Sequence, residues 1–577
     1  MKHETIAPTD RLPLHMPATP RRERVCTTVF PGLMPRGARY GYDGKALSIS
    51  DMENLSPRAY PALAVRSPRE LLVSSRGTGQ PHGMVMMDGV LYYVQGSTLW
   101  RIVGGIHAGA PDGSMNAALF SVGKVTDSKK QMVVFGNRLL IFPDKKYVDA
   151  ADGKLRPMEL DSGVLAGISF SGNSVTLPEG KTWLEMGFEA GDGIRVLNRD
   201  DVTPAPEGNY CIRRLQGRVA YLTDAFAASY ISTAQIKRLV PSPDRLCVSG
   251  NRLIGIQGKD VYISAEGTPF CWNPYRTDGL PDGAGGTTLH IDTDGDLTAC
   301  AAWQGYVMIF KSDRICRLLG NRSDSFTLTE LRAPGIPAAL ADTLCELGGA
   351  LYYHSDSGVY RYGRAGQYPE RIGCLSLSAA IDGCAGSDGA CYYLGRAEAN
   401  EAGESRWETY VYAPEADAWY REDAREAVCM TTMDGYLCRQ DRNGDIWLTR
   451  SDGRMANRPV SEPDRHGPIE ASVTFAPDHA FEPNGYRPVA IAIRATSAPG
   501  GELRVLAICS DGRSRMDAEP QDPLAYTTLA CFAGGMSDRL LRISLLPPAC
   551  DGMILRLEMT GEWMIHSLIW EYEVPRE

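Results

Sequence analysis

The chain has 577 residues, of which 43% are hydrophobic, and its 60 basic and 70 acidic residues give a net charge of −10. The length allows two to four domains, and no apolar run reaches the roughly 18 residues that a membrane-spanning helix needs. The acidic balance argues against a dedicated nucleic-acid-binding protein, which usually carries a basic excess. Fifteen scattered cysteines without a CxxC pair exclude a zinc ribbon or a thioredoxin-like motif. They indicate buried thiols in a protein that folds in a reducing cytoplasm.

Residues 1–30 are polar and rich in proline, and they contain no apolar core of the signal-peptide type. Such a segment holds too little apolar side chain to fold alone. We expect it to be an extended arm, in which residues 6–25 lie on a neighbouring subunit.

A repeated unit follows, and residues 250–264, "GNRLIGIQGKDVYIS", are one example. Each unit has a turn glycine, an apolar run, a polar turn and a second strand. The turn glycines are separated by 47, 114, 55, 44, 40 and 46 residues, and they are Gly89, Gly136, Gly250, Gly305, Gly349, Gly389 and Gly435. A period of about 40 to 55 residues fits a four-stranded propeller blade, with the hairpin as its middle pair of strands.

The sequence therefore predicts an all-β fold, a β-propeller of six to eight blades formed by residues 31–166 and 238–464. A β-sandwich array or a solenoid is the alternative. The long gap between Gly136 and Gly250 predicts an inserted small β-barrel, SH3-like or OB-like, at residues 167–237. Residues 465–577 have longer alternating strands, which predict a C-terminal β-sandwich or jelly roll.

Motifs that carry chemistry are few. Asp292, Asp294 and Asp296 alternate in "HIDTDGDLTA", a spacing that can hold calcium. The glycine at the fourth place and the missing glutamate at the twelfth favour a polar hairpin turn instead. There is no HExxH, G-x-S-x-G or GxxxxGK[ST] motif. We therefore predict no catalytic residue, no cofactor and no enzymatic activity.

Five aromatic residues are predicted to be packing anchors. Phe270 and Trp272 lie in the loop that leaves a blade, and we expect them to cover the next blade. Trp303 begins another repeat, and Trp447 ends a D-x-x-G-x-x-W turn whose tryptophan is expected between blades. Trp570 lies in "WMIHSLIWEYEV", a strand with large apolar residues on both faces. Such a strand belongs in a core or under a neighbouring subunit.

The unit "GNRLIGIQGKDVYISAEGTPFCWN" is similar to one in bacteriophage virion proteins, of the form "nrLy.a…riyyS..gdp.nf". "LGGALYYHSDSGVYRYG" resembles their "v.g.lyflsdrGVy.ydG" segment, and the similarity is greatest over residues 245–365. The family includes tail-tube and nozzle-type proteins of short-tailed phages. In these proteins a propeller lies on the flank of a ring-forming platform built from N- and C-terminal strands.

The resemblance implies a structural tail protein, made in the host bacterial cytoplasm and incorporated into the virion. Copies would form a homo-oligomeric ring, for example a hexamer, that contacts other tail or portal and adaptor proteins. The ring would let double-stranded DNA pass without inserting into a membrane. Two alternatives remain: a host-receptor or glycan-binding tail module, and a propeller hydrolase or lyase that acts on host polysaccharide.

Overall fold

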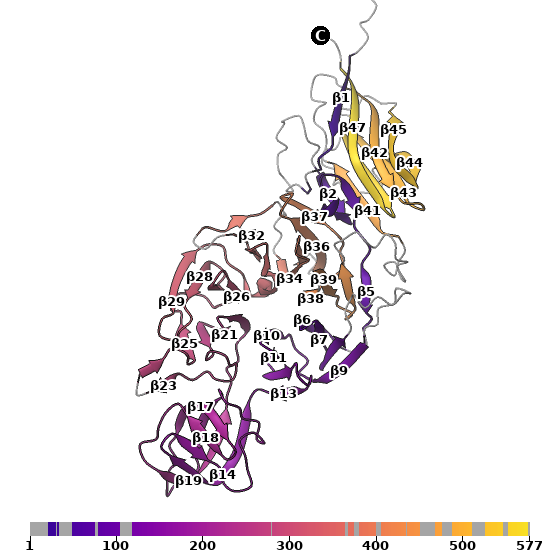
Figure 1. The fold of residues 1–577 in the computed structure, drawn as a ribbon. Coiled ribbons are helices and arrows are strands. Elements are labelled where there is room, and N and C mark those ends of the chain that lie inside the picture. The colour runs from indigo at the N-terminus through magenta and orange to yellow at the C-terminus, as the bar shows by residue number, and fades with distance from the viewer. Residues whose placement is uncertain are drawn as a thin grey trace, which may run out of the picture.

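The computed structural model describes most of the chain. The described residues are 21–30, 32–33, 49–75, 79–103, 118–277, 280–363, 367–373, 380–399, 405–433, 435–449, 468–475, 487–510, 526–545 and 552–574. Strands dominate these residues, and three bodies are visible in Figure 1: a ring of sheets, a barrel below it and a two-sheet unit above it. Within the described residues, no helix is long and apolar enough to cross a membrane.

The ring consists of four-stranded antiparallel sheets, of which the described residues form seven. The first three sheets are β6–β9 (Pro81–Met87, Val90–Gln95, Thr98–Val103, Ala118–Lys124), β10–β13 (Gln131–Phe135, Arg138–Phe142, Lys146–Asp149, Leu155–Pro157) and β20, β21, β22 and β25 (Arg245–Ser249, Arg252–Gln257, Asp260–Ile263, Thr287–His290). The next two are β26–β29 (Ala299–Trp303, Tyr306–Phe310, Arg314–Leu319, Thr327–Arg332) and β30–β33 (Cys345–Leu347, Ala350–Ser355, Gly358–Tyr362, Glu370–Arg371). The last two are β34–β37 (Ala380–Ser387, Tyr392–Ala399, Ser405–Ala413, Ala418–Arg421) and β38–β40 with β5 (Cys429–Met433, Tyr436–Gln440, Ile446–Thr449, Glu70–Val73).

The first strands of these sheets contact one another in cyclic order. β6 contacts β10, β10 contacts β20, β20 contacts β26, β30 contacts β34, β34 contacts β38, and β38 returns to β6. The 3-10 helix η2 (Ala338–Thr343) contacts β26, β31 and β34 and so completes the circle. The last sheet takes its fourth strand, β5, from near the N-terminus, so two distant parts of the chain pair where the ring closes. The propeller-like arrangement agrees with the sequence prediction.

Each of the seven predicted turn glycines precedes the second strand of a different ring sheet. All seven have positive φ, from +55° at Gly250 to +86° at Gly389. Glycine adopts this left-handed conformation without the penalty that a β-carbon imposes. The regular spacing of the glycines in the sequence therefore reflects a turn that every sheet needs before its second strand.

The inserted barrel was predicted correctly, with slightly different bounds. It is a closed barrel in the order β14-β15-β18-β17-β16-β19, around a core that includes Trp183, Phe188 and Ile236. Its strands are β14 (Leu160–Ser171), β15 (Ser174–Thr176), β16 (Gly193–Asn198), β17 (Gly208–Gln216), β18 (Val219–Leu222) and β19 (Tyr230–Arg238). The barrel therefore spans residues 160–238, because the first half of β14 pairs with β19.

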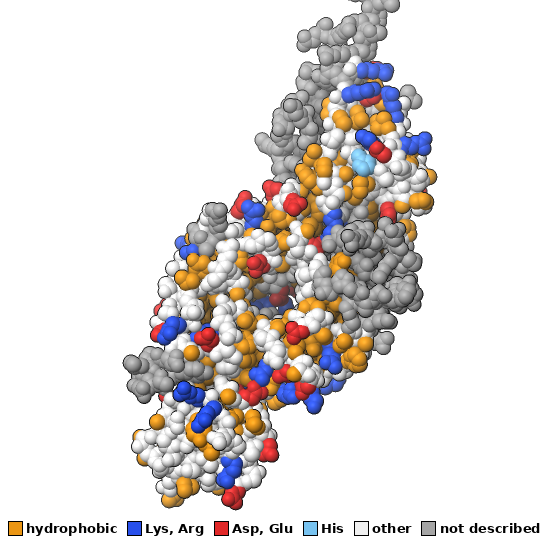
Figure 2. All heavy atoms as spheres, in the orientation of Figure 1, with side chains coloured by type: hydrophobic (Ala, Val, Ile, Leu, Met, Phe, Trp, Pro, Cys, Tyr) orange, Lys and Arg blue, Asp and Glu red, His pale blue; other side chains and the backbone are white. Residues whose placement is uncertain are grey.

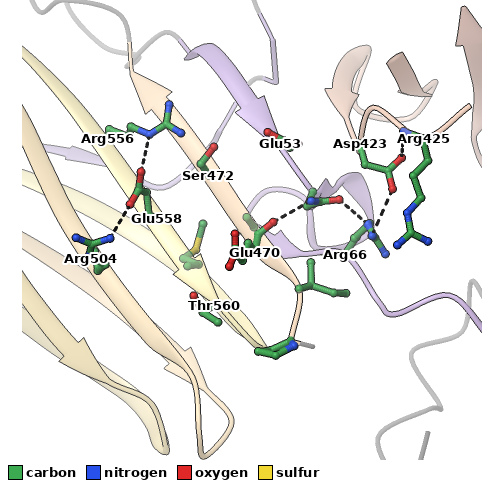
Figure 3. A pocket seen from close by; sticks show the side chains of 15 residues that line it. Glu53, Arg66, Asp423, Arg425, Glu470, Ser472, Arg504, Arg556, Glu558 and Thr560 are labelled. Carbon is green, nitrogen blue, oxygen red and sulfur yellow. Dashed lines mark hydrogen bonds and ion pairs between the residues drawn. The ribbon is translucent and has the colours of Figure 1, made fainter. Parts of the chain in front are cut away.

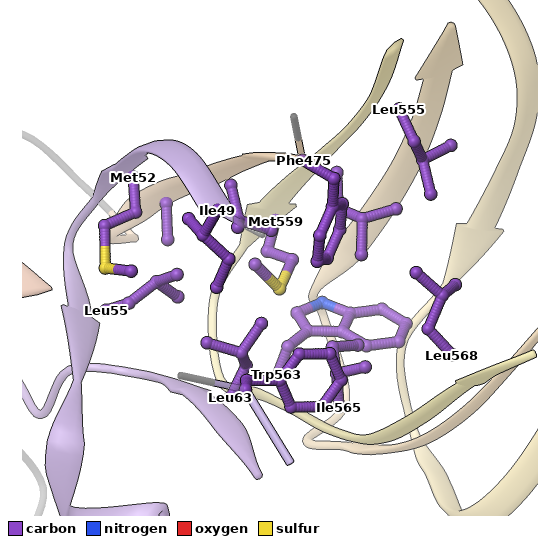
Figure 4. Packing of buried hydrophobic residues seen from close by; sticks show 14 of the residues in the cluster. Ile49, Met52, Leu55, Leu63, Phe475, Leu555, Met559, Trp563, Ile565 and Leu568 are labelled. Carbon is purple, nitrogen blue, oxygen red and sulfur yellow. The ribbon is translucent and has the colours of Figure 1, made fainter. Parts of the chain in front are cut away.

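The two-sheet unit combines strands from both ends of the chain. One sheet contains β1 (Arg21–Thr27), β3 (Leu55–Ser56), β4 (Leu63–Val65), β42 (Arg487–Ser497), β45 (Met536–Ser544) and β47 (Trp563–Val574). The other contains β2 (Ile49–Glu53), β41 (Glu470–Phe475), β43 (Glu502–Ser510), β44 (Thr527–Ala533) and β46 (Gly552–Thr560). Apolar residues from both sheets form one buried cluster, part of which is drawn in Figure 4.

This pairing differs from two predictions. Residues 49–65 were expected in the propeller, but β2 pairs with β41 and β4 pairs with β47. Residues 21–25 were expected to lie on a neighbouring subunit, but they belong to β1, which pairs with residues 568–574 of the same chain. β47 has 12 residues, and β4 covers only the start of its edge, so the rest remains available for β1. Residues 1–20 of the expected arm lie outside the described residues.

The remaining elements are short. The 3-10 helix η1 (Pro57–Ala59) lies between β3 and β4, and β23 (Tyr275–Thr277) pairs with β24 (Leu280–Asp282).

Candidate functional site: the junction between the two-sheet unit and the ring

One ring sheet, β34–β37, carries the two-sheet unit. Its middle strands β35 and β36 have eight and nine residues and are longer than the middle strands of the other ring sheets. Tyr393, Val411 and Tyr420 from this sheet belong to the same buried cluster as Phe30 and Leu55 of the N-terminal segment. Figure 4 shows Leu55 and its neighbours on the side of that cluster opposite the C-terminal strands. Because both bodies bury apolar surface in one cluster, separating them would expose it to water.

A buried carboxylate anchors η1 to this sheet. Asp388 accepts the backbone N–H of Cys391 at 2.8 Å and the hydroxyl of Tyr393 at 2.9 Å, and it pairs with the guanidinium of Arg58. Burial, followed by the negative charges of Glu422 and Asp388, raises the pKa of Tyr393 well above its ordinary value. Tyr393 therefore stays protonated and donates to Asp388, which holds Arg58 against the ring.

A second buried network lies where the chain passes from β4 to β5. Arg69 is 1% exposed; it donates to Asp423 at 2.6 Å and also to Glu422. Arg66 and Arg439 lie 3.6 and 3.7 Å from the same Asp423 carboxylate. Burial alone would raise the pKa of Asp423, but Arg69 and then Arg439 hold it well below its ordinary value. Burial, followed by repulsion from Arg69, lowers the pKa of Arg439 to about 10.

Asn54 joins three segments at this network. Its backbone N–H donates to the Glu422 carbonyl at 2.6 Å, and its side-chain amide donates to the Glu470 carbonyl at 2.8 Å. Its amide oxygen accepts from Arg66 Nε at 2.7 Å. Asn54 has φ of +56°, a conformation that asparagine tolerates better than most residues. A single turn residue therefore bonds the two-sheet unit, the ring and the segment that leads to β5.

Beside the network lies a cleft of about 540 Å³ between the two bodies, shown in Figure 3. On the side formed by β43 and β46, Glu558 lies between Arg556, at 3.1 Å, and Arg504, at 3.4 Å. On the opposite side, Arg66 faces Asp423. Charged residues of both signs line the cleft, so it presents no single-sign field to a ligand.

A second hollow of about 290 Å³ lies on the ring axis and is lined by first strands of the sheets; Figure 2 shows the ring opening onto it. Asp342 lies there between Lys129 and Arg245, with 2.5 Å to Arg245 Nη1. Burial would raise the pKa of Asp342, but Arg245 and Lys129 lower it. Cys384 and Cys429 also line the hollow. Burial raises the pKa of Cys429 to about 12, so this thiol is protonated at neutral pH.

The three aspartates that were the weak candidate for a calcium site lie apart from both hollows. Asp292, Asp294 and Asp296 are all exposed, and the described residues contain no cluster of three or more His, Cys, Asp or Glu that could hold a metal ion. The ammonium group of the buried Lys311 instead fills the turn. It donates to the Thr293 carbonyl at 2.6 Å and to the Asp294 carbonyl at 3.2 Å. The positive charge of a lysine thus already lies against two carbonyl oxygens of this turn.

Four of the five predicted packing anchors are almost completely buried. Trp303 donates to the carbonyl of Gly349 in the following sheet. Trp447 donates to Asp441 at 3.0 Å and lies in β40 opposite Leu71 of β5. Trp570 is 1% exposed and lies within the cluster of the two-sheet unit. Its own chain therefore covers it without a neighbouring subunit.

Phe270 is the fourth buried anchor, and Trp272 is partly buried beside it. They were expected to cover the next blade, but they pack on the preceding sheet, where the Phe270 ring lies 5.0 Å from that of Tyr147. The loop turns this way because the Phe270 carbonyl accepts the backbone N–H of Gly193 in the barrel, which follows that preceding sheet. Arg238 and Arg138 stack on the ring at 4.3 and 4.9 Å.

Sequence reasoning singled out none of the charged junction residues. Arg69 and its partner Asp423 are 354 residues apart, and nothing local distinguishes them among 60 basic and 70 acidic residues. The adjacent acids Glu422 and Asp423 directly after the aromatic strand β37 were the one local signal, because two acids next to a buried strand need partners.

Comparisons with known proteins found similar solved structures at low sequence identity. No protein-family model matches the chain, and no curated protein matches it. Among solved structures, the computationally designed Ika8 protein is similar over 66% of this chain and 100% of its own, with 13% identity and a TM-score of 0.35. Apo AztD from Citrobacter koseri is similar over 65% and 94%, with 11% identity and a TM-score of 0.32. BamB from Moraxella catarrhalis is similar over 67% and 99%, with 10% identity and a TM-score of 0.32.

Proposed function

We propose that this chain is a structural, non-enzymatic component of a bacteriophage tail, of the nozzle or tail-tube type. One observation carries the proposal: strands from both ends of the chain, β1–β4 and β41–β47, form one two-sheet unit. The virion proteins that the sequence resembles have a platform of this composition with a propeller on its flank. Copies of the two-sheet unit would form the ring-shaped platform, and the propeller would support its outside or contact neighbouring tail proteins.

In this proposal the seven four-stranded sheets are the blades of a seven-bladed propeller that β5 closes. The two-sheet unit is a β-sandwich, because its sheets share one apolar cluster. The buried network of Arg69, Glu422 and Asp423 joins sandwich and propeller. A force on the propeller would therefore be transmitted to the platform instead of being lost in a flexible linker.

The charge of the chain suits a channel through which DNA moves. At a net charge of −10, the protein has fewer basic than acidic residues, and basic residues are the ones that bind phosphate by releasing counterions. Double-stranded DNA would pass without being retained. The protein would be made in the bacterial cytoplasm and work in the virion.

Particle imaging of the purified full chain tests the proposal. We expect oligomeric rings of several copies in negative-stain images, and a mass in mass photometry that is an integral multiple of 62.9 kDa. The chain should also be present in purified virions. Trp570→Ala should weaken the assembly of these oligomeric rings because Trp570 supports the two-sheet unit. Trp183→Ala, equally buried but in the barrel core, should leave ring formation intact. A chain that stays monomeric at every concentration and is missing from virions would contradict the proposal.

The two alternatives have their own readouts. Binding of the full chain to host glycans, lost on removal of the barrel, would favour a receptor module. Release of soluble sugar from host cell walls, abolished by changing one Asp or Glu, would favour a hydrolase or lyase.

A further inference from the structure

The barrel and the ring meet at an ordered boundary. The loop that follows β22 reaches back to the barrel, where the Phe270 carbonyl accepts the N–H of Gly193 at 3.1 Å and the Asn273 amide donates to the Tyr210 carbonyl at 3.2 Å. Arg238 at the end of β19 pairs with Asp192 at 2.8 Å, and both side chains are 1% exposed. Bonds from several elements therefore fix the position of this loop against the barrel.

Two cysteines face each other across the boundary. Cys211 lies in β17 of the barrel and Cys271 in the ring loop; they are 60 residues apart in the sequence, and their sulfur atoms are 3.2 Å apart. Their exposures are 1% and 0%, and Ala265 completes a small apolar cluster around them. Sulfur atoms joined in a disulfide are about 2.05 Å apart, so a movement of about 1 Å would close the bond.

A glycine holds the two backbones close enough for this contact. A β-carbon on Gly193 would lie 3.0 Å from the Cys271 Cα and 3.1 Å from its sulfur atom. The close approach needs a residue without a side chain at this position. The thiol pair is therefore set by the backbone arrangement and does not depend on flexible side chains meeting by chance.

We propose that Cys211 and Cys271 are a modification site: they form a disulfide that ties the barrel to the ring once the protein meets a disulfide oxidant. The inference rests on the proposed function for one point, the passage from a reducing cytoplasm to oxidising surroundings. Because the protein folds before it meets the oxidant, the disulfide would form in the folded protein. It would fix the barrel in the position that it already occupies.

The chemistry is thiol–disulfide exchange with a small disulfide such as oxidised glutathione. The thiolate of one cysteine attacks the glutathione disulfide, which forms a mixed disulfide and releases one glutathione thiolate. The second cysteine, as thiolate, attacks the protein sulfur of the mixed disulfide and releases the other glutathione. Two protein thiols are oxidised, one glutathione disulfide is reduced to two thiols, and the two cysteine protons pass to the glutathione thiolates.

Burial should make the first step slow. The hydrogen bond with Cys271 and then burial raise the pKa of Cys211 well above its ordinary value, and only the thiolate is a nucleophile. We expect iodoacetamide to label this pair at least about 100-fold more slowly in the native reduced protein than in urea. Oxidation should require a transient opening of the boundary, after which the bond prevents further opening.

The experiment uses the full chain, purified with reductant and then moved into a series of reduced and oxidised glutathione mixtures. Remaining thiols are blocked with N-ethylmaleimide, and peptides are mapped without reduction. We expect one dominant cross-linked pair, Cys211 with Cys271, that dithiothreitol reverses. Oxidation should raise the Tm of the barrel transition on the order of 10 °C, because the cross-link restricts the unfolded chain.

Cys211→Ser should abolish both the cross-link and the Tm shift, whereas Cys316→Ser, at another buried thiol, should leave both unchanged. If Cys211→Ser fails to fold, the comparison of oxidised with reduced parent protein still decides. A pair that stays reduced across the series, or an oxidised protein with unchanged or lower Tm, would overturn the proposal. These measurements do not depend on the assembly of copies into an oligomer. A negative result here is therefore distinguishable from failure of the proposed tail function.

Discussion

Replacing Arg69 by methionine should open the ring where β5 closes it. Arg69 immediately precedes β5, and its guanidinium donates to both Glu422 and Asp423. Removing one partner of a buried ion pair typically costs about 3 to 5 kcal/mol, because the remaining charge stays buried without its partner. Here Asp423 keeps Arg66 and Arg439 nearby, and Arg439 is relieved of repulsion from Arg69. We therefore expect the lower end, about 3 kcal/mol.

Hydrogen–deuterium exchange gives a local measurement of this loss. β5 pairs with β40, with Leu71 opposite Trp447, so peptides covering residues 70–73 and 446–449 report release of the closing strand. A loss of about 3 kcal/mol corresponds to a roughly 100-fold faster exchange if the strand opens locally. The midpoint of urea unfolding, followed on the same variant, should also fall.

Arg22→Met provides the control, because Arg22 pairs with Glu573 at 3.3 Å but is 64% exposed. An exposed pair contributes about 0 to 1 kcal/mol, so exchange near β5 should not change. Arg69→Met with exchange and unfolding midpoints like those of the parent would refute the reasoning. It would mean that the apolar contacts of β5 alone close the ring.

Three further predictions concern separate sites. Trp570→Ala should destabilise the two-sheet unit by about 3 to 5 kcal/mol in urea unfolding. Leu540→Ala, at a residue that is 55% exposed, should change stability by less than about 0.5 kcal/mol. Equal effects of the two substitutions would show that Trp570 is not a core residue. Burial, followed by repulsion from Arg396, lowers the pKa of His354 to about 4, so the unfolded chain, with an ordinary value near 6.5, takes up the proton first. Stability should therefore fall by about 2 kcal/mol from pH 7 to pH 5, and His354→Gln should remove that slope; an unchanged slope would assign it to other groups. Millimolar calcium should not shift Tm, because the Lys311 ammonium already lies against two carbonyl oxygens of the turn; a clear rise would indicate a calcium site after all.

The ring and the barrel could be predicted from the sequence because local chain chemistry reveals them. A turn at positive φ favours glycine, so Gly136, Gly250 and the others mark successive sheets. The 114-residue interval between Gly136 and Gly250 is too long for one sheet, which reveals the barrel. These signals depend on residues that are close together in the chain.

The two-sheet unit and the junction could not be assigned in the same way. β2 and β41 pair across more than 400 residues, and alternation of polar and apolar residues shows that a strand exists without naming its partner. The charged junction residues have the same problem. From the sequence alone, Asp423 is indistinguishable from a solvated surface acid, because only the fold brings Arg69 next to the end of β37.

Closure of the ring and attachment of the two-sheet unit are coupled by chain connectivity. β4 ends at Val65 in the unit and β5 begins at Glu70 in the ring, and the five Cα–Cα steps between these two residues span at most about 18 Å. Within that link, Arg66 and Arg69 both contact Asp423. If β5 separates from β40, the short link to β4 and the ion pairs with Asp423 must therefore be strained or broken as well. A disturbance of the unit should therefore reach the ring at β5 and at the sheet β34–β37, which shares its buried cluster, before it reaches the other five sheets.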